Sequence, residues 1–557
     1  MTLKYRLLET LFALLSGLLC LELTVGHSVL DPTTVAWLLN GGDYQQHYLG
    51  WEFFRLEPLL QFPLGSLQKL GTGLLPSVVY TDSLPLFAIP FKAIFSLIGF
   101  SEFFQYSGLW IFSCFSLQVF FARRCLKLMG CSSVGACALS FVVGLSPTLL
   151  FRLAGHDYPV GHLALMGQWL LLWSINLTLL RHCSIRRWSW LLFLALATHA
   201  YLFAMCFALF FADLLNKDTR LARPRIKRGL LLLLFLLILE ALSIGYFSST
   251  SSAYADAGYG TYKWNLLSWF NGSPNWSALL RLWTVDNGEY EGFSYFGLLP
   301  VLSLLLLCRR DNRLYLRSIV LPRWQVWLAS LLMAAFAMTL SIGFGPFQFP
   351  ISGLPFPLSI IGQTFRASGR FVWPLYYLAS LTLLSILDRT LQRIVSRKSL
   401  YYFVLSFLAL IAFWDLSPAL SQLRLSHSGA HGASSCPIVL NSDGLKVHSI
   451  PVRNRPENWS YWQWFALCNE ASTSIGNFAR FDEKQASLLD RSLRSELSSG
   501  RPDPNTIYVV NDLDFLDRLN LPRLFVSGSW IVGAKPAIAS VSRLLDPSKA
   551  VSGSSNE

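Results

Sequence analysis

The chain alternates between long apolar runs and short polar connections over most of its length. A transmembrane helix needs about 20 mostly apolar residues, and eleven runs approach or reach that length. The pattern therefore predicts a mostly α-helical, polytopic transmembrane bundle with about eleven crossings. The predicted crossings are 7–26, 105–122, 131–151, 159–180, 188–198, 200–215, 229–247, 293–308, 324–343, 371–387 and 400–418.

Basic residues between the runs predict which side of the membrane each connection faces. Connections on the inner side carry an excess of Lys and Arg, and such clusters occur at 123–127, 181–187, 217–228, 309–323 and 389–398. Eleven crossings place the N-terminus and all five clusters inside, with His199 at the outer turn between the two short runs. The first run is too long for an ordinary signal peptide, so we interpret it as an uncleaved first helix.

If the apolar run 84–100 crossed the membrane, the basic clusters that follow it would fall on the outer side. We interpret it as a helix that dips into or lies on the outer surface, within a large first outer loop over 27–104. The last crossing leaves 419–557 outside. Strand-like runs at 507–510 and 524–526 predict a small extracytoplasmic α/β domain there, with a disordered tail from about Asp546. The expected division is a membrane domain over 1–418 and a C-terminal domain over 419–557.

Composition supports a membrane protein and argues against a nucleic-acid partner. Hydrophobic residues make up 53% of the chain and charged residues 14%, whereas soluble domains carry about 25% charged residues. The net charge is +13, but the basic residues lie in short clusters and form no stripe with interleaved aromatic residues. Among the ten cysteines, only Cys436 and Cys468 lie in the C-terminal segment. They form one disulfide if that segment is extracytoplasmic, or they are two unrelated buried thiols.

The stretch Gly41-Gly42-Asp43 begins the most informative segment of the first outer loop. Two glycines permit a sharp turn and a close approach to a ligand. Aromatic residues then recur at helical spacing, which predicts a helix at the membrane surface with Asp43 at its start. Asp43 is either a functional carboxylate at the membrane boundary or only a helix cap.

Most conspicuous polar residues fall on the outer side of the predicted topology. Ionisable groups at membrane depth are costly, so they are functional candidates, although outer loops must be polar in any case. The set comprises Asp43, His47, Asp82, His156, Asp157, His162, His199, Lys263, Glu289, Glu291, Arg366 and Arg370.

Arg366 and Arg370 enter the tenth crossing four residues apart. If 366–370 is helical, their guanidinium groups share one face and make a site for a phosphate or pyrophosphate. The alternative is a pair of snorkelling side chains that anchors the helix at lipid headgroups.

Six motifs carry a resemblance to a known group of proteins. GGDYQQHYLGWEFFR, FPLG, TDSLP, GHDYPVGHLAL, YEGFSYFG and FRASGRFVWP are spread over 41–374. Together with acidic residues in the first outer loop and after the third crossing, they resemble the GT-C membrane glycosyltransferases. The chain is most similar to an uncharacterised bacterial family of GT-C-like membrane proteins.

This resemblance implies an inverting transfer of a sugar from a polyprenyl-phosphate-linked donor to an acceptor on the extracytoplasmic face. The acceptor nucleophile needs a carboxylate base, and the leaving lipid phosphate needs cations. Asp43 matches the base, and Asp157 matches the second acidic position. Arg366, Arg370 and Lys263 would bind the donor phosphate. The remaining implied substrate-binding residues are His47, His156, His162, His199, Tyr290 and Glu291.

The resemblance also implies partners, cofactor and location. The partners are the sugar lipid, membrane lipids and a glycan, lipid or protein acceptor. A divalent cation, Mg²⁺ or Mn²⁺, is an open question, because a lone Asp157 replaces the Asp-x-Asp pattern of metal-dependent oligosaccharyltransferases. The expected location is a bacterial inner membrane, with a cytoplasmic N-terminus and a periplasmic C-terminal domain. The competing interpretations are a lipid-linked glycan transporter and a non-catalytic assembly protein for envelope polysaccharide.

Overall fold

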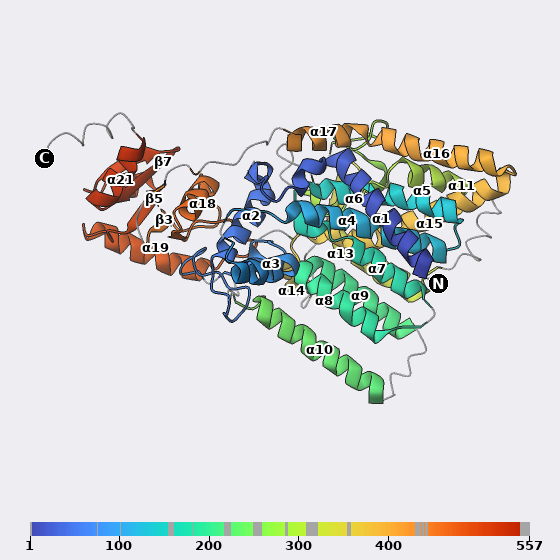
Figure 1. The fold of residues 1–557 in the computed structure, drawn as a ribbon, viewed down its shortest axis with the longest axis horizontal. Helices are drawn as coiled ribbons and strands as arrows, with labels where there is room; N and C mark the ends of the chain where they lie inside the picture. The colour runs from blue at the N-terminus through green and yellow to red at the C-terminus, as the bar shows by residue number, and fades with distance from the viewer. Residues whose placement is uncertain are drawn as a thin grey trace. The chain divides into compact units, whose positions relative to one another are not determined.

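The computed structural model describes 3–39, 41–74, 76–100, 102–153, 161–180, 182–216, 224–248, 259–284, 288–307, 321–351, 353, 358–428, 436, 439–440 and 444–545. The chain divides into two units (Figure 1). The first unit contains 1–37, 106–238 and 254–431. The second contains 38–105, 239–253 and 432–557. The predicted disordered tail from Asp546 lies outside the described residues.

The first unit is a bundle of helices formed by the apolar runs. Its helices are α1 (Leu3–Thr24), α4 (Ser107–Leu128), α5 (Ser133–Gly144), α6 (Pro147–Leu150), α7 (Trp169–Leu179), α8 (Ile185–Thr198), α9 (Ala200–Asn216), α10 (Pro224–Ile244), α11 (Leu298–Leu306), α13 (Trp324–Met338), α14 (Leu358–Thr364), α15 (Trp373–Ile394), α16 (Lys398–Asp415) and α17 (Ser417–Ser428). A two-stranded antiparallel hairpin, β1 (Ser341–Phe344) and β2 (Phe347–Pro350), follows α13. The last turns of α10 belong to the second unit.

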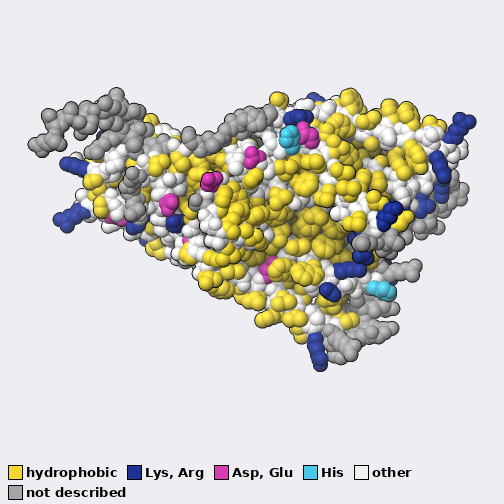
Figure 2. All heavy atoms as spheres, viewed as in Figure 1, with side chains coloured by type: hydrophobic (Ala, Val, Ile, Leu, Met, Phe, Trp, Pro, Cys, Tyr) yellow, Lys and Arg dark blue, Asp and Glu magenta, His cyan; other side chains and the backbone are white. Residues whose placement is uncertain are grey.

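Every predicted crossing contains or overlaps one of these helices. Within the described residues, five helices are long and apolar enough to cross a membrane: Lys4–Thr24, Ser107–Leu128, Ser133–Leu153, Ser368–Ile394 and Lys398–Asp415. Hydrophobic side chains cover the face of this unit in view, and most of its Lys and Arg side chains in view gather at the end where α1 begins (Figure 2). The chain is therefore a membrane protein, and the number of eleven crossings stays a prediction.

The centre of the first unit is α4, which packs against α1, α5 and α7. Small residues permit close helix contact in membranes. At Gly17 of α1, a Cβ atom would lie 2.1 Å from the Ser116 hydroxyl oxygen of α4. A larger residue at Gly17 would therefore force these two helices apart.

The second unit combines the first outer loop with the C-terminal α/β domain. The loop contributes α2 (Gly42–Arg55), η3 (Val78–Tyr80) and α3 (Pro85–Ile98). The C-terminal part contributes β3 (Lys446–Ile450), α18 (Trp459–Cys468), β4 (Ser472–Thr473), α19 (Glu483–Ser498), β5 (Thr506–Val510), α20 (Leu513–Leu516), β6 (Arg523–Val526), β7 (Ser529–Gly533) and α21 (Lys535–Leu545). The predicted strand-like runs are thus β5 and β6, and the run at 84–100 is a helix, as predicted.

The C-terminal sheet has the order β4-β3-β5-β7-β6. β3 pairs in parallel with β4 and β5, whereas β7 pairs antiparallel with β5 and β6. Four of the five residues of β3 and all five residues of β5 are buried, as expected for central strands that are covered on both faces.

The first outer loop packs directly on this sheet domain. Leu70 forms a parallel bridge with Thr473 of β4, and the Ala479 amide donates to the Tyr80 carbonyl at 2.7 Å. The Trp464 ring of α18 lies 6.5 Å from Tyr48 of α2 and 5.2 Å from Phe103, measured between ring centroids. The predicted domain boundary at 418 places this loop with the membrane domain, whereas its contacts group it with the C-terminal domain.

Cys436 and Cys468 form a disulfide that joins the segment before β3 to the end of α18. The two residues are 32 positions apart, and closing a loop of that size stabilises a fold by about 3 kcal/mol. We expect the double variant Cys436→Ser/Cys468→Ser to lower the free energy of unfolding of the second unit by about 3 kcal/mol. Hydrogen exchange of the β3 and β5 amides measures this change. An unchanged exchange rate would show that the disulfide contributes no stability.

Burial of His448 on β3 makes the stability of the second unit depend on pH. Burial, aided by Lys446, lowers the pKa of His448 to about 4. Because the ordinary pKa is about 6.5, the unfolded chain binds the extra proton between pH 6.5 and 4. Stability is therefore present above pH 6.5 and is lost on acidification through this range. Between pH 4 and 6.5, we expect His448→Leu to reduce the slope of the free energy of unfolding against pH by about 1.4 kcal/mol per pH unit. Hydrogen exchange of the β5 amides measures this slope. An unchanged slope would contradict this assignment.

Candidate functional sites in the two units

Asp43 and His47 lie on α2 of the second unit. Gly41 and Gly42 have φ angles of 104° and 65°, which L residues rarely adopt, so the sharp turn predicted from the sequence is present. The N-cap is Gly41 rather than Asp43. Asp43 is half-buried in the first turn, where the helix dipole favours a negative charge. The helix is buried around its whole circumference from Tyr44 to Arg55, whereas the sequence predicts burial on one aromatic face.

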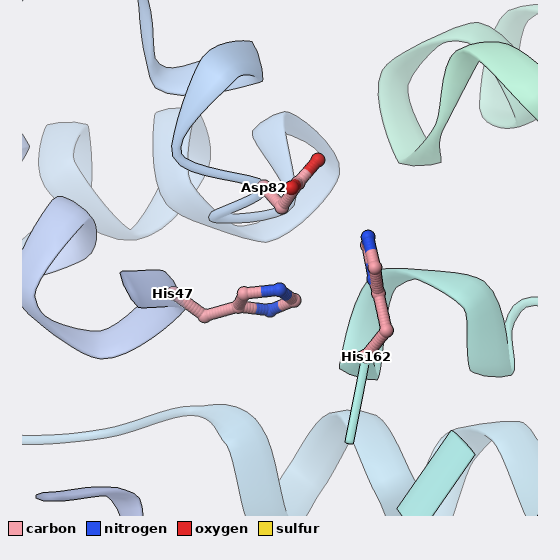
Figure 3. Close-up of side chains that lie close together, drawn as sticks. All are labelled: His47, Asp82 and His162. Carbon is pink, nitrogen blue, oxygen red and sulfur yellow. The ribbon is translucent and has the colours of Figure 1, made fainter. Parts of the chain in front are cut away.

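Asp82 lies beside His47 in the same unit (Figure 3). Asp82 follows η3 with a φ of 56°, and its carboxylate accepts a hydrogen bond of 3.3 Å from the Gln46 amide of α2. A carboxylate oxygen of Asp82 and a ring nitrogen of His47 lie within 4.8 Å of each other. Burial lowers the pKa of His47 to about 3, so its imidazole is neutral at physiological pH. His162, also labelled in Figure 3, belongs to the first unit.

The pair formed by His47 and Asp82 has donor atoms suited to a divalent cation. Neutral imidazole favours Zn²⁺ and other transition metals, whereas Mg²⁺ prefers oxygen ligands. The donor set therefore fits Mn²⁺ or Zn²⁺ better than the Mg²⁺ allowed by the sequence. Two donors are fewer than the three or four protein ligands usual for zinc, so this pair would supply only part of a coordination shell.

The first unit contains a buried cluster of Arg152, Glu291 and Arg370. One Glu291 oxygen accepts from Arg152 at 2.9 Å and from Arg370 Nε at 2.8 Å, and the other accepts from Arg370 at 2.5 Å. Arg152 also donates to the Glu291 carbonyl at 3.2 Å. Burial raises the pKa of Glu291, but the two guanidinium groups outweigh it and lower that pKa to about 2. The cluster therefore contains a carboxylate and two cations at neutral pH.

Helix ends and 3₁₀ turns position the three side chains. Arg152 is in η4 (Phe151–Leu153), Glu291 in η7 (Glu289–Gly292) and Arg370 in η8 (Ser368–Val372). Arg152 and Arg370 also lie at the ends of candidate membrane spans, Ser133–Leu153 and Ser368–Ile394. The cluster is thus at the boundary of the apolar core, and ionisable groups at membrane depth are functional candidates.

Aromatic and histidine side chains extend this cluster within the first unit. The Arg370 guanidinium lies 4.8 Å from the centroid of the Tyr201 ring, a cation–π geometry. The Tyr201 ring lies 5.5 Å from His199, and the His199 ring lies 5.1 Å from His162. His199 joins α8 to α9, as the predicted turn requires. Four segments far apart in sequence therefore converge on one polar region.

Lys263, Glu289 and Tyr290 occupy the neighbouring loops. The Lys263 ammonium donates to the Ser341 hydroxyl at 3.3 Å. Glu289 is buried and accepts from the amides of Asn265 at 3.0 Å and Gln348 at 2.9 Å. The Tyr290 ring lies 5.9 Å from Tyr262.

Arg366 and Arg370 do not share a helical face. Arg366 is half-buried in a bend, and Arg370 is buried in a 3₁₀ turn. The Ala367 amide donates to the Tyr201 hydroxyl and the Gly369 amide donates to the Tyr262 carbonyl, both at 2.9 Å. Arg366 lies outside the 3₁₀ turn that contains Arg370, and 366–370 is not an α-helix. The helix over 366–370 on which the shared face depends is therefore not formed, and a role for either residue in phosphate binding stays a prediction.

Sequence reasoning missed Arg152 of the cluster and Tyr201 beside it. Arg152 ends an apolar run, and Tyr201 begins another, so neither stands out in the pattern. A lone arginine at the outer end of a predicted crossing is the signal that could have identified Arg152. His156 and Asp157 lie outside the described residues.

Comparisons with solved structures give only a weak likeness. The archaeal oligosaccharyltransferase AglB from Archaeoglobus fulgidus, in complex with an inhibitory peptide and a dolichol-phosphate, aligns at 10% identity with a TM-score of 0.34, covering 91% of this chain and 70% of that chain. The apo form of the Archaeoglobus fulgidus oligosaccharyltransferase aligns at 12% identity with a TM-score of 0.36, covering 84% and 64%. Its complex with Zn and sulfate aligns at 11% identity with a TM-score of 0.35, covering 90% and 67%.

Sequence comparison is decisive for the family. No curated protein matches the chain. Residues 445–524 match the DUF6311 C-terminal domain, and 13–417 match the family described as a domain of unknown function, DUF6311. Since the latter match spans more than half of the chain, the protein belongs to the DUF6311 family.

Proposed function

We propose that this membrane protein is a glycosyltransferase that moves a sugar from a polyprenyl-phosphate-linked donor to an acceptor on the extracytoplasmic face. The observation that carries the proposal is the convergence of Arg152, Tyr201, Glu291 and Arg370 in the first unit. Oriented guanidinium groups beside an apolar core suit an anionic headgroup attached to a lipid. A sugar lipid phosphate has both properties.

The proposed reaction inverts the configuration at the sugar carbon. Asp43 accepts the proton of the acceptor hydroxyl or amide as that group attacks the anomeric carbon. The bond between this carbon and the donor phosphate oxygen breaks, and the electron pair leaves with the lipid phosphate. Arg366, Arg370 and Lys263 stabilise the leaving phosphate, with Arg370 held by Glu291. Asp157 is the proposed second carboxylate, and His47, His156, His162, His199 and Tyr290 are the proposed substrate contacts.

A divalent cation, if bound at His47 and Asp82, would supply Lewis-acid stabilisation of a phosphate oxygen. The protein residues would still supply the proton acceptor and the lipid site. This proposal concerns the second unit alone, because both donors belong to it.

We also propose that the protein lies in a bacterial inner membrane, with the N-terminus in the cytoplasm and the C-terminal domain in the periplasm. The Cys436–Cys468 disulfide supports an oxidising compartment for that domain, because structural disulfides persist outside the cytosol. The basic connections support the opposite side for the N-terminus.

Transfer by purified protein tests the proposed activity. Proteoliposomes containing the protein are supplied with labelled sugar lipids extracted from the native membrane and with a soluble membrane-free acceptor fraction. We expect label to move from lipid to acceptor. Movement of intact sugar lipid across the bilayer, with no change in its chemical form, would support a transporter instead and would contradict the proposal.

A further inference from the structure

A charge-free loop in the second unit exposes an unusual amount of apolar surface. Residues 58–67 contain no Asp, Glu, Lys or Arg. Leu60 and Phe62 are 92% and 75% exposed, and Leu59 and Leu64 are also exposed. The Gln61 amide, by contrast, donates to the Leu64 and Ser66 carbonyls at 3.1 and 2.9 Å. The loop therefore satisfies part of its own backbone with its polar side chain and presents its apolar side chains outward.

The loop is fixed to the last turn of α10. The Leu64 amide donates to the Ser243 carbonyl at 2.6 Å, and the Ser77 hydroxyl donates to the Ile244 carbonyl at 2.9 Å. At Gly65, a Cβ atom would lie 2.0 Å from the Ile244 carbonyl oxygen. The position of the loop is consequently set by the end of α10.

α10 itself has the surface of a helix that faces lipid. It exposes Leu231, Leu232, Leu234, Phe235, Leu236, Ile238, Leu239 and Leu242, and Figure 1 shows it lying along the edge of the helical unit. Contiguous apolar patches of this kind are rare on proteins in water. Phe247, just beyond the helix, is also 63% exposed. The apolar surface of α10 thus continues past its last turn onto the attached loop.

We propose that an apolar rim formed by Leu59, Leu60, Phe62, Leu64, Leu242 and Phe247 inserts into the outer leaflet of the membrane. Lipid is the occupant that matches this rim, because the rim continues a lipid-facing helix surface and 58–67 carries no charge. Hydrogen bonds from Gln61 within the loop, and from the Leu64 amide to Ser243, satisfy part of the backbone, as an apolar medium requires. The rim fixes the height of the second unit at the bilayer, whatever reaction the protein catalyses.

Spin labels on single introduced cysteines test this insertion in the full-length protein. Leu60→Cys and Phe62→Cys report on the rim, and the exposure of both side chains means that neither substitution removes core packing. Leu232→Cys on α10 is the lipid-facing reference, and Ser487→Cys on the exposed face of α19 is the aqueous reference. Labelled wild-type protein gives the signal of its own free cysteines, which is subtracted.

The measurement is the ratio of collision rates with O₂ and with a polar nickel complex in lipid nanodiscs. We expect the ratio at positions 60 and 62 to approach that at 232 and to exceed that at 487 by about tenfold, because hydrocarbon enriches O₂ and excludes polar solutes. A ratio at both rim positions equal to that at 487 would overturn the proposal. Protection from both colliders would also overturn it, since it would indicate a covering protein.

Discussion

Glu291→Gln is expected to lower the free energy of unfolding of the helical unit by about 4 kcal/mol, in the range usual for removal of one partner from a buried ion pair. The substitution keeps the volume of the side chain but removes its charge. Arg152 and Arg370 are 1% and 7% exposed, so two guanidinium groups would remain buried together without their carboxylate. Titration with SDS, followed by tryptophan fluorescence, measures the loss.

Glu289→Gln is the matched control for this prediction. Glu289 is two residues away and is also buried, but Asn265 and Gln348 supply neutral amide donors. Loss of its charge should cost about 1–3 kcal/mol, as for an ordinary buried hydrogen bond to a charged group.

The double variant Glu291→Gln/Arg370→Gln removes one of the two buried cations. It should therefore recover part of the stability that Glu291→Gln alone loses. Equal losses in the two single variants would contradict a special role for the Arg152–Glu291–Arg370 cluster.

Asp43→Asn is expected to reduce sugar transfer by about 100-fold or more, which is the range for loss of a general base. Asparagine keeps the shape and the position in the first turn of α2, so folding and lipid binding should persist. The readout is the rate of transfer at saturating donor, compared with the donor dissociation constant. We expect the transfer rate to fall while the donor dissociation constant stays unchanged.

Asp31→Asn provides the control for charge removal. Asp31 is exposed, and its carboxylate accepts hydrogen bonds from the Thr33 amide and hydroxyl. Its loss should change transfer by less than about twofold, since exposed polar substitutions have small effects. If Asp43→Asn transfers sugar as fast as Asp31→Asn, Asp43 is a helix-terminal residue and not the base.

The helices of this protein follow from its sequence because each depends on local hydrophobic pattern. The run at 84–100 became α3, beginning at Pro85, where proline is tolerated in the first turn. The strands β5 and β6 likewise follow from short β-branched and aromatic runs. His199 lies between α8 and α9, where the distribution of basic clusters predicts a turn.

Contacts between distant segments could not be predicted in the same way. The bridge between Leu70 and Thr473 joins segments separated by nearly three-quarters of the chain, and neither segment has a pattern that identifies the other. The same limit applies to Arg152, whose partner Glu291 lies 139 positions away in the chain. The segment at Arg366 also contacts distant residues, since Tyr201 and Tyr262 accept hydrogen bonds from its Ala367 and Gly369 amides.

Analysis of the released lipid is the most direct test of the proposed glycosyltransferase activity. Purified protein is incubated with a defined polyprenyl-phosphate sugar and an acceptor fraction, and the lipid products are identified by mass spectrometry. The proposed reaction predicts free polyprenyl phosphate and glycosylated acceptor in equal amounts, with both formed about 100-fold more slowly by Asp43→Asn. Recovery of intact sugar lipid alone, in the presence of folded protein that binds it, would contradict the proposed function.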